Sequence, residues 1–215
     1  HVTKSFPIGG QRKVVAKDIS ATFPSGKSVA LLGRNGAGKS TLLQMIAGTI
    51  EPTHGTIDIT GTISWPVGFS GSFHPELTGS QNTRFIARIY GVDTDELADF
   101  VEDFAQLGAH FRQPFRTYSA GMRSRLAFGI SMGIAFDTYL VDEVTSVGDA
   151  AFRARSAEVF HARMKHAGAL VVTHSMGQVR ELCDSGAVLE NGKLTYYEDL
   201  EEAIAQHEAN MRPTG

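Results

Sequence analysis

The chain has 215 residues, with 20 Lys and Arg against 23 Asp and Glu, so its formal charge at pH 7 is −3. A duplex-binding domain usually carries a basic excess, so this balance argues against a nucleic-acid-binding protein. Apolar residues make up 42% and charged residues 20%, which excludes a disordered chain. The single cysteine, Cys183, cannot form an intramolecular disulfide, and no apolar run approaches the roughly 20 residues that span a bilayer. We therefore expect a soluble protein of a reducing compartment, which reaches a membrane only through a partner.

The predicted elements of the first half begin with residues 28–32 (SVALL), an apolar run that ends in glycine and is typical of a buried parallel strand. Residues 39–47 follow with helical spacing and stop at Gly48, so strand, glycine loop and helix form the first half of a βαβ unit. Residues 56–65 are β-like in composition. Residues 79–107 are helical, with a cap at Asp93 or Thr94 and one apolar face that comprises Leu97, Phe100, Val101, Phe104 and Leu107.

In the second half, strands are predicted at residues 138–141 and 169–173, with a helix at 149–166 between them. Residues 187–197 read as a hairpin that turns at Asn191-Gly192. The pattern predicts an α/β fold: a P-loop NTPase core with a β-rich N-terminal portion and a helical insert at about residues 79–117. We expect one domain over residues 1–215.

A phosphate-binding loop is predicted at residues 33–40 (GRNGAGKS), which match GxxxxGK followed by Ser or Thr between the predicted strand and helix. Backbone N–H groups can wrap a phosphate only if the chain comes close, which favours glycine at three positions of the loop. Lys39 is expected at the β- and γ-phosphates, and the Ser40 hydroxyl on Mg²⁺. The phosphate-binding candidates are Gly33, Arg34, Asn35, Gly36, Ala37, Gly38, Lys39, Ser40 and Thr41.

Two consecutive acids, Asp142 and Glu143, follow the strand predicted at residues 138–141. That strand delivers both carboxylates to the carboxyl end of the sheet, beside the phosphate loop. Asp142 would hold Mg²⁺, directly or through water, and Glu143 would polarise the attacking water as a general base. A solvated acidic turn is the alternative interpretation.

Together these motifs resemble the nucleotide-binding domain of ABC transporters over nearly the whole chain. Residues 118–122 (YSAGM) stand where that family has its LSGGQ-type signature, and Ser119 and Gly121 are the residues that match it. Asp149 is the acid of a segment similar to the family's D-loop. His174, after the strand predicted at 169–173, matches the switch histidine that contacts the γ-phosphate. The resemblance implies an ABC ATPase that binds ATP with Mg²⁺.

The same resemblance implies a homodimer in the ATP-bound state, in which Ser119 and Gly121 of one subunit close over the γ-phosphate held by the other. The charge of that phosphate is fully surrounded only when the second helix N-terminus arrives, so a monomer should bind ATP but hydrolyse it poorly. Closure and reopening would move an integral membrane permease, which places the chain at the cytoplasmic face of a bacterial inner membrane.

Three segments, residues 63–79, 117–132 and 139–149, are more specifically similar to the ATPase subunits of bacterial polysaccharide exporters, above all the capsular type. O-antigen exporters share the FHPELTG stretch but often carry an extra C-terminal carbohydrate-binding domain, for which this chain has no room. The expected function is therefore ATP-driven export of capsular or related cell-surface polysaccharide. Export of O-antigen or teichoic acid is the alternative.

The chain departs from the family at the loop before the helical insert, where a Gln usually ligates Mg²⁺ and senses the transporter. Residues 68–77 contain no Gln, and an ungapped register places Phe69 there. Family geometry puts the permease groove along residues 65–76 and part of 79–116. Near the N-terminus, Phe6 is the candidate for the aromatic ring that stacks on adenine, with simple packing as the alternative.

Two rival functions remain open. A soluble P-loop kinase would use basic lid residues, a role for which Arg112, Arg116, Arg123 and Arg125 are available, and would have no use for a signature segment. An ABC-type ATPase without a transporter usually has two ATPase domains or long insertions, whereas this chain has one set of motifs.

Overall fold

A computed structural model describes residues 1–68, 71, 73–142 and 149–212 of the chain. The chain divides into two compact units, each considered in turn. The sheet unit comprises His1–Pro66, Asp137–Glu143 and His166–Gly215, and the helical unit comprises Val67–Phe136 and Val144–Lys165. Within the described residues, no helix is both long enough and apolar enough to cross a membrane.

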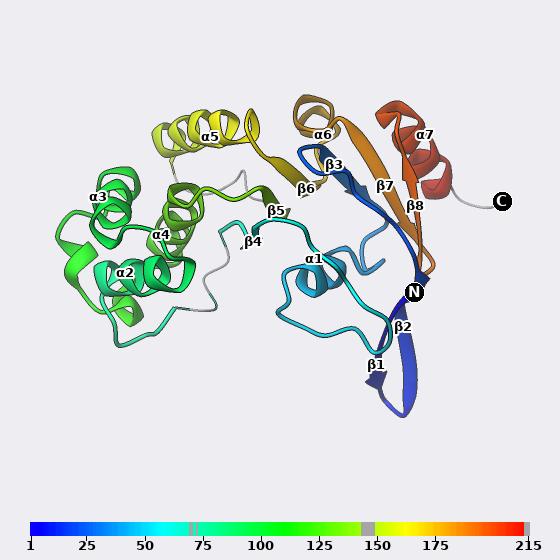
Figure 1. Cartoon of the computed structure of the whole chain (residues 1–215), viewed down its shortest axis with the longest axis horizontal. Helices are drawn as coiled ribbons and strands as arrows, with labels where there is room; N and C mark the ends of the chain where they lie inside the picture. The colour runs from blue at the N-terminus through cyan, green and yellow to red at the C-terminus, as the bar shows by residue number, and fades with distance from the viewer. Residues whose placement is uncertain (69–70, 72, 143–148, 213–215) are drawn as a thin grey trace. The chain divides into compact units, whose positions relative to one another are not determined.

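A six-stranded sheet forms the centre of the sheet unit, in the order β4-β5-β6-β3-β7-β8 (Figure 1). The first five strands in this order are parallel, and β8 closes the edge as the antiparallel arm of a hairpin. All five residues of β3 and of β6 are buried, as expected for central strands covered on both faces. The bounds are β3 Ser28–Leu32, β4 Ile63–Pro66, β5 Thr138–Asp142, β6 Gly168–Val172, β7 Ser185–Glu190 and β8 Lys193–Tyr197.

The sequence predicted most of these strands, including the hairpin of β7 and β8. Its turn lies at Asn191-Gly192, where both residues have positive φ angles, 51° and 78°, as the expected turn type requires. The prediction for residues 56–65 was wrong in extent, because only β4 is a strand there. A strand needs a partner, and β4 finds one only where Ile63 aligns with Thr138 of β5.

A separate antiparallel pair, β1 Val2–Ile8 and β2 Gln11–Ile19, makes the N-terminal portion β-rich, as predicted. Among its described residues, the sheet unit also has three helices: α1 Lys39–Ile46, α6 Met176–Leu182 and α7 Leu200–Met211. Helix α1 buries Leu42, Leu43 and Met45 in the main apolar core, and α7 packs on β7 (Figure 1).

The described elements of the helical unit are helices and short 3-10 turns, which pack against one another around a core of their own (Figure 1). Thr78 caps α2 through a capping box with Gln81, and Asp93, one of the two predicted alternatives, caps α3. The predicted apolar face of α3 is buried at Leu97, Val101 and Phe104, so the periodicity identified the core side correctly. The elements are α2 Gly79–Tyr90, α3 Thr94–Ala105, η1 Gly108–Arg112, η2 Phe115–Thr117, α4 Ala120–Gly133 and α5 Ala150–Met164.

Candidate functional site: a nucleotide pocket and a capped signature helix

The phosphate loop joins the end of β3 to the start of α1, as the sequence predicted. A Cβ at Gly33 would lie 2.5 Å from the carbonyl oxygen of Leu189, so the loop passes too close to β7 for a side chain. Gly38, the residue before α1, has φ 107° and would place a Cβ 3.1 Å from that of Val15. Glycine is therefore required at both ends of the loop by close approach and by backbone conformation.

The ammonium group of Lys39 lies over this loop. Its Nζ donates hydrogen bonds to the carbonyl oxygens of Gly33 at 2.7 Å and Arg34 at 3.0 Å. His207 of α7 is close enough to Lys39 to sense its charge: burial and then Lys39 lower the pKa of the imidazole. The loop thus presents a cation together with the N-terminus of α1, the arrangement that binds phosphates.

A pocket of about 720 Å³ opens in front of the loop. It unites candidates from distant parts of the sequence: the loop itself, Phe6 of β1, Asp142 at the end of β5, and His174 after β6. Glu143, the proposed general base, lies outside the described residues, as does Phe69. The lining residues are Phe6, Lys13, Val15, Asn35, Gly36, Gly38, Lys39, Ser40, Thr41, Asp142, Val172 and His174.

The pocket also offers oxygen donors of the kind that Mg²⁺ takes. The Ser40 hydroxyl and the Asp142 carboxylate both line it, beside the cationic loop. Mg²⁺ is usually held by one or two carboxylates or hydroxyls together with substrate phosphates, so this donor set fits the ion.

Sequence reasoning missed Lys13 and Val15, which line the pocket from β2. They stand two residues apart on a strand and therefore share a face, and Lys13 pairs directly with Phe6 of β1. The ammonium of Lys4 lies 5.0 Å from the centroid of the Phe6 ring, a cation–π contact on the same hairpin. The sequence shows that residues 13 and 15 would lie on one face of a strand. It does not show that Lys13 pairs with Phe6 of the neighbouring strand.

The signature residues lie in the helical unit, at the start of α4. Ser119 caps this helix, because its Oγ accepts a hydrogen bond from the backbone N of Met122 at 3.2 Å. Ser119 and Gly121 are both exposed. Apart from its two chain neighbours and the backbone of the helix itself, the Ser119 Oγ, at 4.0 Å, is the only atom of the described residues within 4 Å of a Cβ placed on Gly121. The helix N-terminus is therefore open to an approaching anion.

Asp149 lies at the start of α5, also in the helical unit. Its carboxylate accepts a hydrogen bond from the backbone N of Phe152 at 2.9 Å and pairs with Arg125 of α4. The Phe152 hydrogen bond and then Arg125 hold the pKa of this carboxyl below its usual range. Asp149 thus ties the start of α5 to the helix that begins with the signature.

Comparison with known proteins gives a consistent result. A family model described as "ABC transporter" matches residues 16–146. The polysialic acid transport ATP-binding protein KpsT of Escherichia coli is 48% identical over 210 residues, which cover 96% of this chain and 94% of that protein. The capsule polysaccharide export ATP-binding protein CtrD of Neisseria meningitidis serogroup B is 42% identical over 203 residues, 94% of each chain.

A solved structure of a dimeric ATP-binding cassette, in a post-hydrolysis state with ADP and phosphate bound, matches with a TM-score of 0.73. The match is 22% identical in sequence and covers 93% of this chain and 96% of that one. At this identity the likeness concerns the fold, and it agrees with the α/β class expected from the sequence.

Proposed function

Because this chain belongs to the ABC transporter family and is an ATPase, we propose that it drives the export of capsular or related polysaccharide across a bacterial inner membrane. The observation that carries the ATPase part is the single pocket shared by Lys39, Ser40, Asp142 and His174. The similarity of this chain to capsule export proteins, over nearly its full length, supports polysaccharide as the exported substrate. Membership of this family excludes the rival soluble kinase.

The residues predicted from the sequence to bind or hydrolyse ATP have distinct roles in this proposal. The loop N–H groups and Lys39 bind the phosphates of ATP, and His174 contacts the γ-phosphate. Ser40 and Asp142 would hold Mg²⁺, which neutralises charge on the phosphates when bound. Glu143 accepts a proton from the attacking water. Phe6 stacks on adenine, and the Lys4 ammonium lies 5.0 Å from the centroid of the Phe6 ring.

We further propose that residues 1–215 act as one ATPase domain, with the helical insert at about 79–117, and that two copies close around ATP. Ser119 and Gly121 of one copy would meet the γ-phosphate bound by the other. Their exposure at the start of α4 supports this role, because a second molecule can reach that helix N-terminus. Asp149 would lie beside the same closed site.

The membrane partner is an integral permease, and the chain would work at the cytoplasmic face of the inner membrane. Contact along residues 65–76 and part of 79–116 is supported by exposed apolar side chains on α2. Phe85 is 50% exposed and Ile89 is 59% exposed, one helical turn apart on the same face. Large apolar groups exposed together are typical of interaction surfaces.

The ATPase mechanism is tested with Glu143→Gln, which removes the base but leaves the pocket residues in place. ATP turnover should fall by about a hundredfold or more, and light scattering should show a dimer with Mg-ATP but a monomer with ADP. A chain that binds ATP but stays monomeric under these conditions would contradict closure of two copies around the nucleotide.

The export function is tested in a bacterium whose own copy of this chain has been deleted. The wild-type chain should restore polysaccharide at the cell surface, whereas Glu143→Gln should leave polymer inside the cell. Chemical analysis of the retained polymer separates capsular polysaccharide from the alternatives, O-antigen and teichoic acid. Normal surface polysaccharide with Glu143→Gln would overturn the proposed function.

A further inference from the structure

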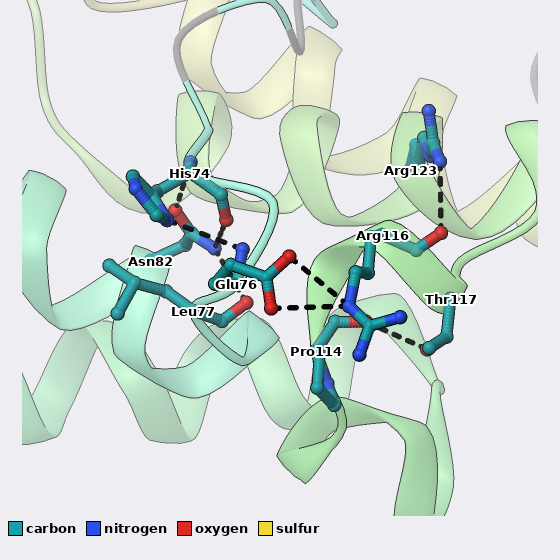
Figure 2. Close-up of polar contacts among 8 residues, drawn as sticks. All are labelled: His74, Glu76, Leu77, Asn82, Pro114, Arg116, Thr117 and Arg123. Atoms are coloured by element: carbon teal, nitrogen blue, oxygen red, sulfur yellow. Dashed lines mark hydrogen bonds and ion pairs between the residues drawn. The ribbon is translucent and has the colours of Figure 1, made fainter.

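Two segments far apart in the sequence, residues 74–78 and 114–118, are hydrogen bonded to each other within the helical unit (Figure 2). The backbone N of Phe115 donates to the carbonyl oxygen of Leu77, and that of Arg116 donates to Pro75, both at 2.9 Å. The second segment leads directly into Ser119, the cap of α4. The start of the signature helix is therefore built onto residues 74–78.

Asn82, on α2, fixes the first of these segments from inside. Figure 2 shows its Nδ2 donating to the carbonyl oxygens of His74 and Leu77, at 3.1 and 3.2 Å, and its Oδ1 accepting from the His74 N at 2.9 Å. The Nδ2 also donates to the Thr78 carbonyl oxygen at 3.1 Å. The side chain is buried, with 1% of the residue exposed. A buried amide with all its hydrogen bonds made rigidifies its surroundings, so Asn82 fixes the position of residues 74–78.

Arg123, in the first turn of α4, holds the second segment. Its Nε donates to the carbonyl oxygen of Tyr118 at 3.1 Å and its Nη2 to that of Arg116 at 3.3 Å, and the guanidinium lies 5.3 Å from the centroid of the Phe115 ring. A cation near a helix N-terminus opposes the helix dipole. Here the carbonyl oxygens of Arg116 and Tyr118 stabilise the Arg123 cation. Because Tyr118 directly precedes Ser119, the orientation of Arg123 is linked to that of Ser119.

An exposed ion pair is the third connection. Arg116 Nε lies 3.2 Å from the carboxylate of Glu76, and the two side chains are 60% and 63% exposed (Figure 2). Such a pair adds little to folding, because water competes for both charges. It does, however, join the same two segments as the backbone hydrogen bond from Arg116 to Pro75.

We propose that Arg123 is a positioning residue for Ser119, and that the Glu76–Arg116 pair aligns the segment that Arg123 holds with residues 74–78. This inference rests on the proposed function, since it is the closed, ATP-bound dimer that uses Ser119. Asn82 holds residues 74–78 rigidly. Arg123 orients the carbonyl groups of Arg116 and Tyr118. These contacts together fix the position of Ser119.

The test uses the isolated full chain with Glu143→Gln as the parent, titrated with Mg-ATP while light scattering follows the dimer. Adding Arg123→Ala should raise the ATP concentration at half-dimerisation by about tenfold, as expected for the loss of a charge-assisted hydrogen bond. ATP binding by the monomer, measured at low protein concentration, should stay unchanged. Unchanged ATP binding would show that the sheet unit, which carries the pocket, is intact.

Arg123→Lys serves as the conservative variant, because a lysine keeps the charge and reaches one carbonyl but cannot span two. It should recover part of the lost dimerisation. For the ion pair, Glu76→Arg and Arg116→Glu should each weaken dimerisation, and the double exchange should restore it. The matched control is the Glu102–Arg112 pair, which joins α3 to η1 and should tolerate the same exchange without effect.

Circular dichroism melting checks that each variant is folded. If the parent dimerises and folded Arg123→Ala dimerises at the same ATP concentration, the inference is overturned while the proposed function stands. If the double exchange of Glu76 and Arg116 fails to restore what the single changes lose, the role of the ion pair is overturned. A parent that stays monomeric overturns the proposed closure of two copies around ATP, and this inference with it.

Discussion

Arg125 and Asp149 are joined by an ion pair in which Nη2 of the guanidinium lies 2.7 Å from a carboxylate oxygen. The same guanidinium lies 4.6 Å from the centroid of the Phe152 ring, and Phe152 donates its backbone N–H to Asp149. Three residues thus connect the helix that begins with the signature to the cap of α5. The Arg125 charge on α4 therefore holds the start of α5, and the Asp149 charge at the start of α5 holds α4.

This arrangement predicts a pH dependence. Because the pKa of Asp149 is lowered on folding, by the Phe152 hydrogen bond and then by Arg125, its carboxylate stabilises the fold above the ordinary carboxyl pKa. The stabilisation is lost as the pH falls through the lowered pKa. Asp149→Ala should unfold at less urea than the wild type at pH 7, and the two curves should converge at an acid pH below the lowered pKa, where the carboxyl is protonated. A midpoint difference of equal size at both pH values would contradict this origin.

Gly33 gives a prediction about the phosphate loop. Gly33→Ala should cost about 3 kcal/mol and abolish ATP binding, because the new Cβ meets the Leu189 carbonyl oxygen. Gly48→Ala is the matched control: its φ is also positive, at 70°, but no atom of the residues that the structure describes, apart from its chain neighbours, lies within 4 Å of the new Cβ. The change should therefore cost only about 1 kcal/mol of backbone strain. Urea unfolding and ATP titration measure both variants. An equal loss of unfolding free energy in both variants would show that the contact with the Leu189 carbonyl oxygen does not destabilise Gly33→Ala.

Lys13 is predicted to contribute to nucleotide binding, because it lines the pocket opposite Phe6. Lys13→Ala should raise the dissociation constant for ATP by about two- to fivefold, the range of an exposed charge pair, and the effect should shrink in high salt. Lys17→Ala, on the same strand but not in the pocket lining, should bind ATP like the wild type. Calorimetric titration distinguishes them; a loss common to both variants would indicate a general effect of charge.

Asn82→Asp is predicted to destabilise the helical unit by about 3 kcal/mol, since it replaces a buried NH₂ group by an oxygen that faces three carbonyls. Asn210→Asp, at an exposed position where the amide pairs with Gln206, should change stability little. Thermal melting compares the two. A stable Asn82→Asp variant would mean that residues 74–78 can do without the amide.

Cys183 should be inert in the folded protein. Burial, and then the charge of Asp184, raises the pKa of its thiol to about 12, so the reactive thiolate is scarce at pH 8. Iodoacetamide should leave the native chain unlabelled and label the urea-unfolded chain quickly, as mass spectrometry would detect. Fast labelling of the native chain at pH 8 would show that the end of α6 opens readily.

Local patterns were enough to predict the phosphate loop and its flanks. The apolar run at residues 28–32, the glycines and Lys39 define strand, loop and helix without help from distant residues, and β3 and α1 begin where expected. Ser119 was likewise identifiable as a helix cap, because a cap acts within its own turn. Asp142 required one more assumption, that parallel strands end at one edge of the sheet. His174 was assigned only through the resemblance to the ABC family.

Long-range relationships were not predictable in this way. Asn82 looks like a polar surface residue of a helix, and it becomes a buried anchor only because residues 74–78 fold back over it. Lys13 reaches the pocket through the register of a hairpin that propensity alone does not fix. The strand expected from residue 56 failed for a related reason, because the partner strand begins only opposite Ile63.

The sheet order has a consequence for synthesis of the chain. The strand that carries the phosphate loop, β3, has β6 and β7 as its neighbours, and both are encoded far downstream. A chain emerging from the ribosome exposes the loop early, but it lacks the strands on either side until residues 168–190 have been made. Pairing across such a separation is intrinsically slow. A nascent chain therefore acquires the strands on either side of its ATP site only after residues 168–190 have been made.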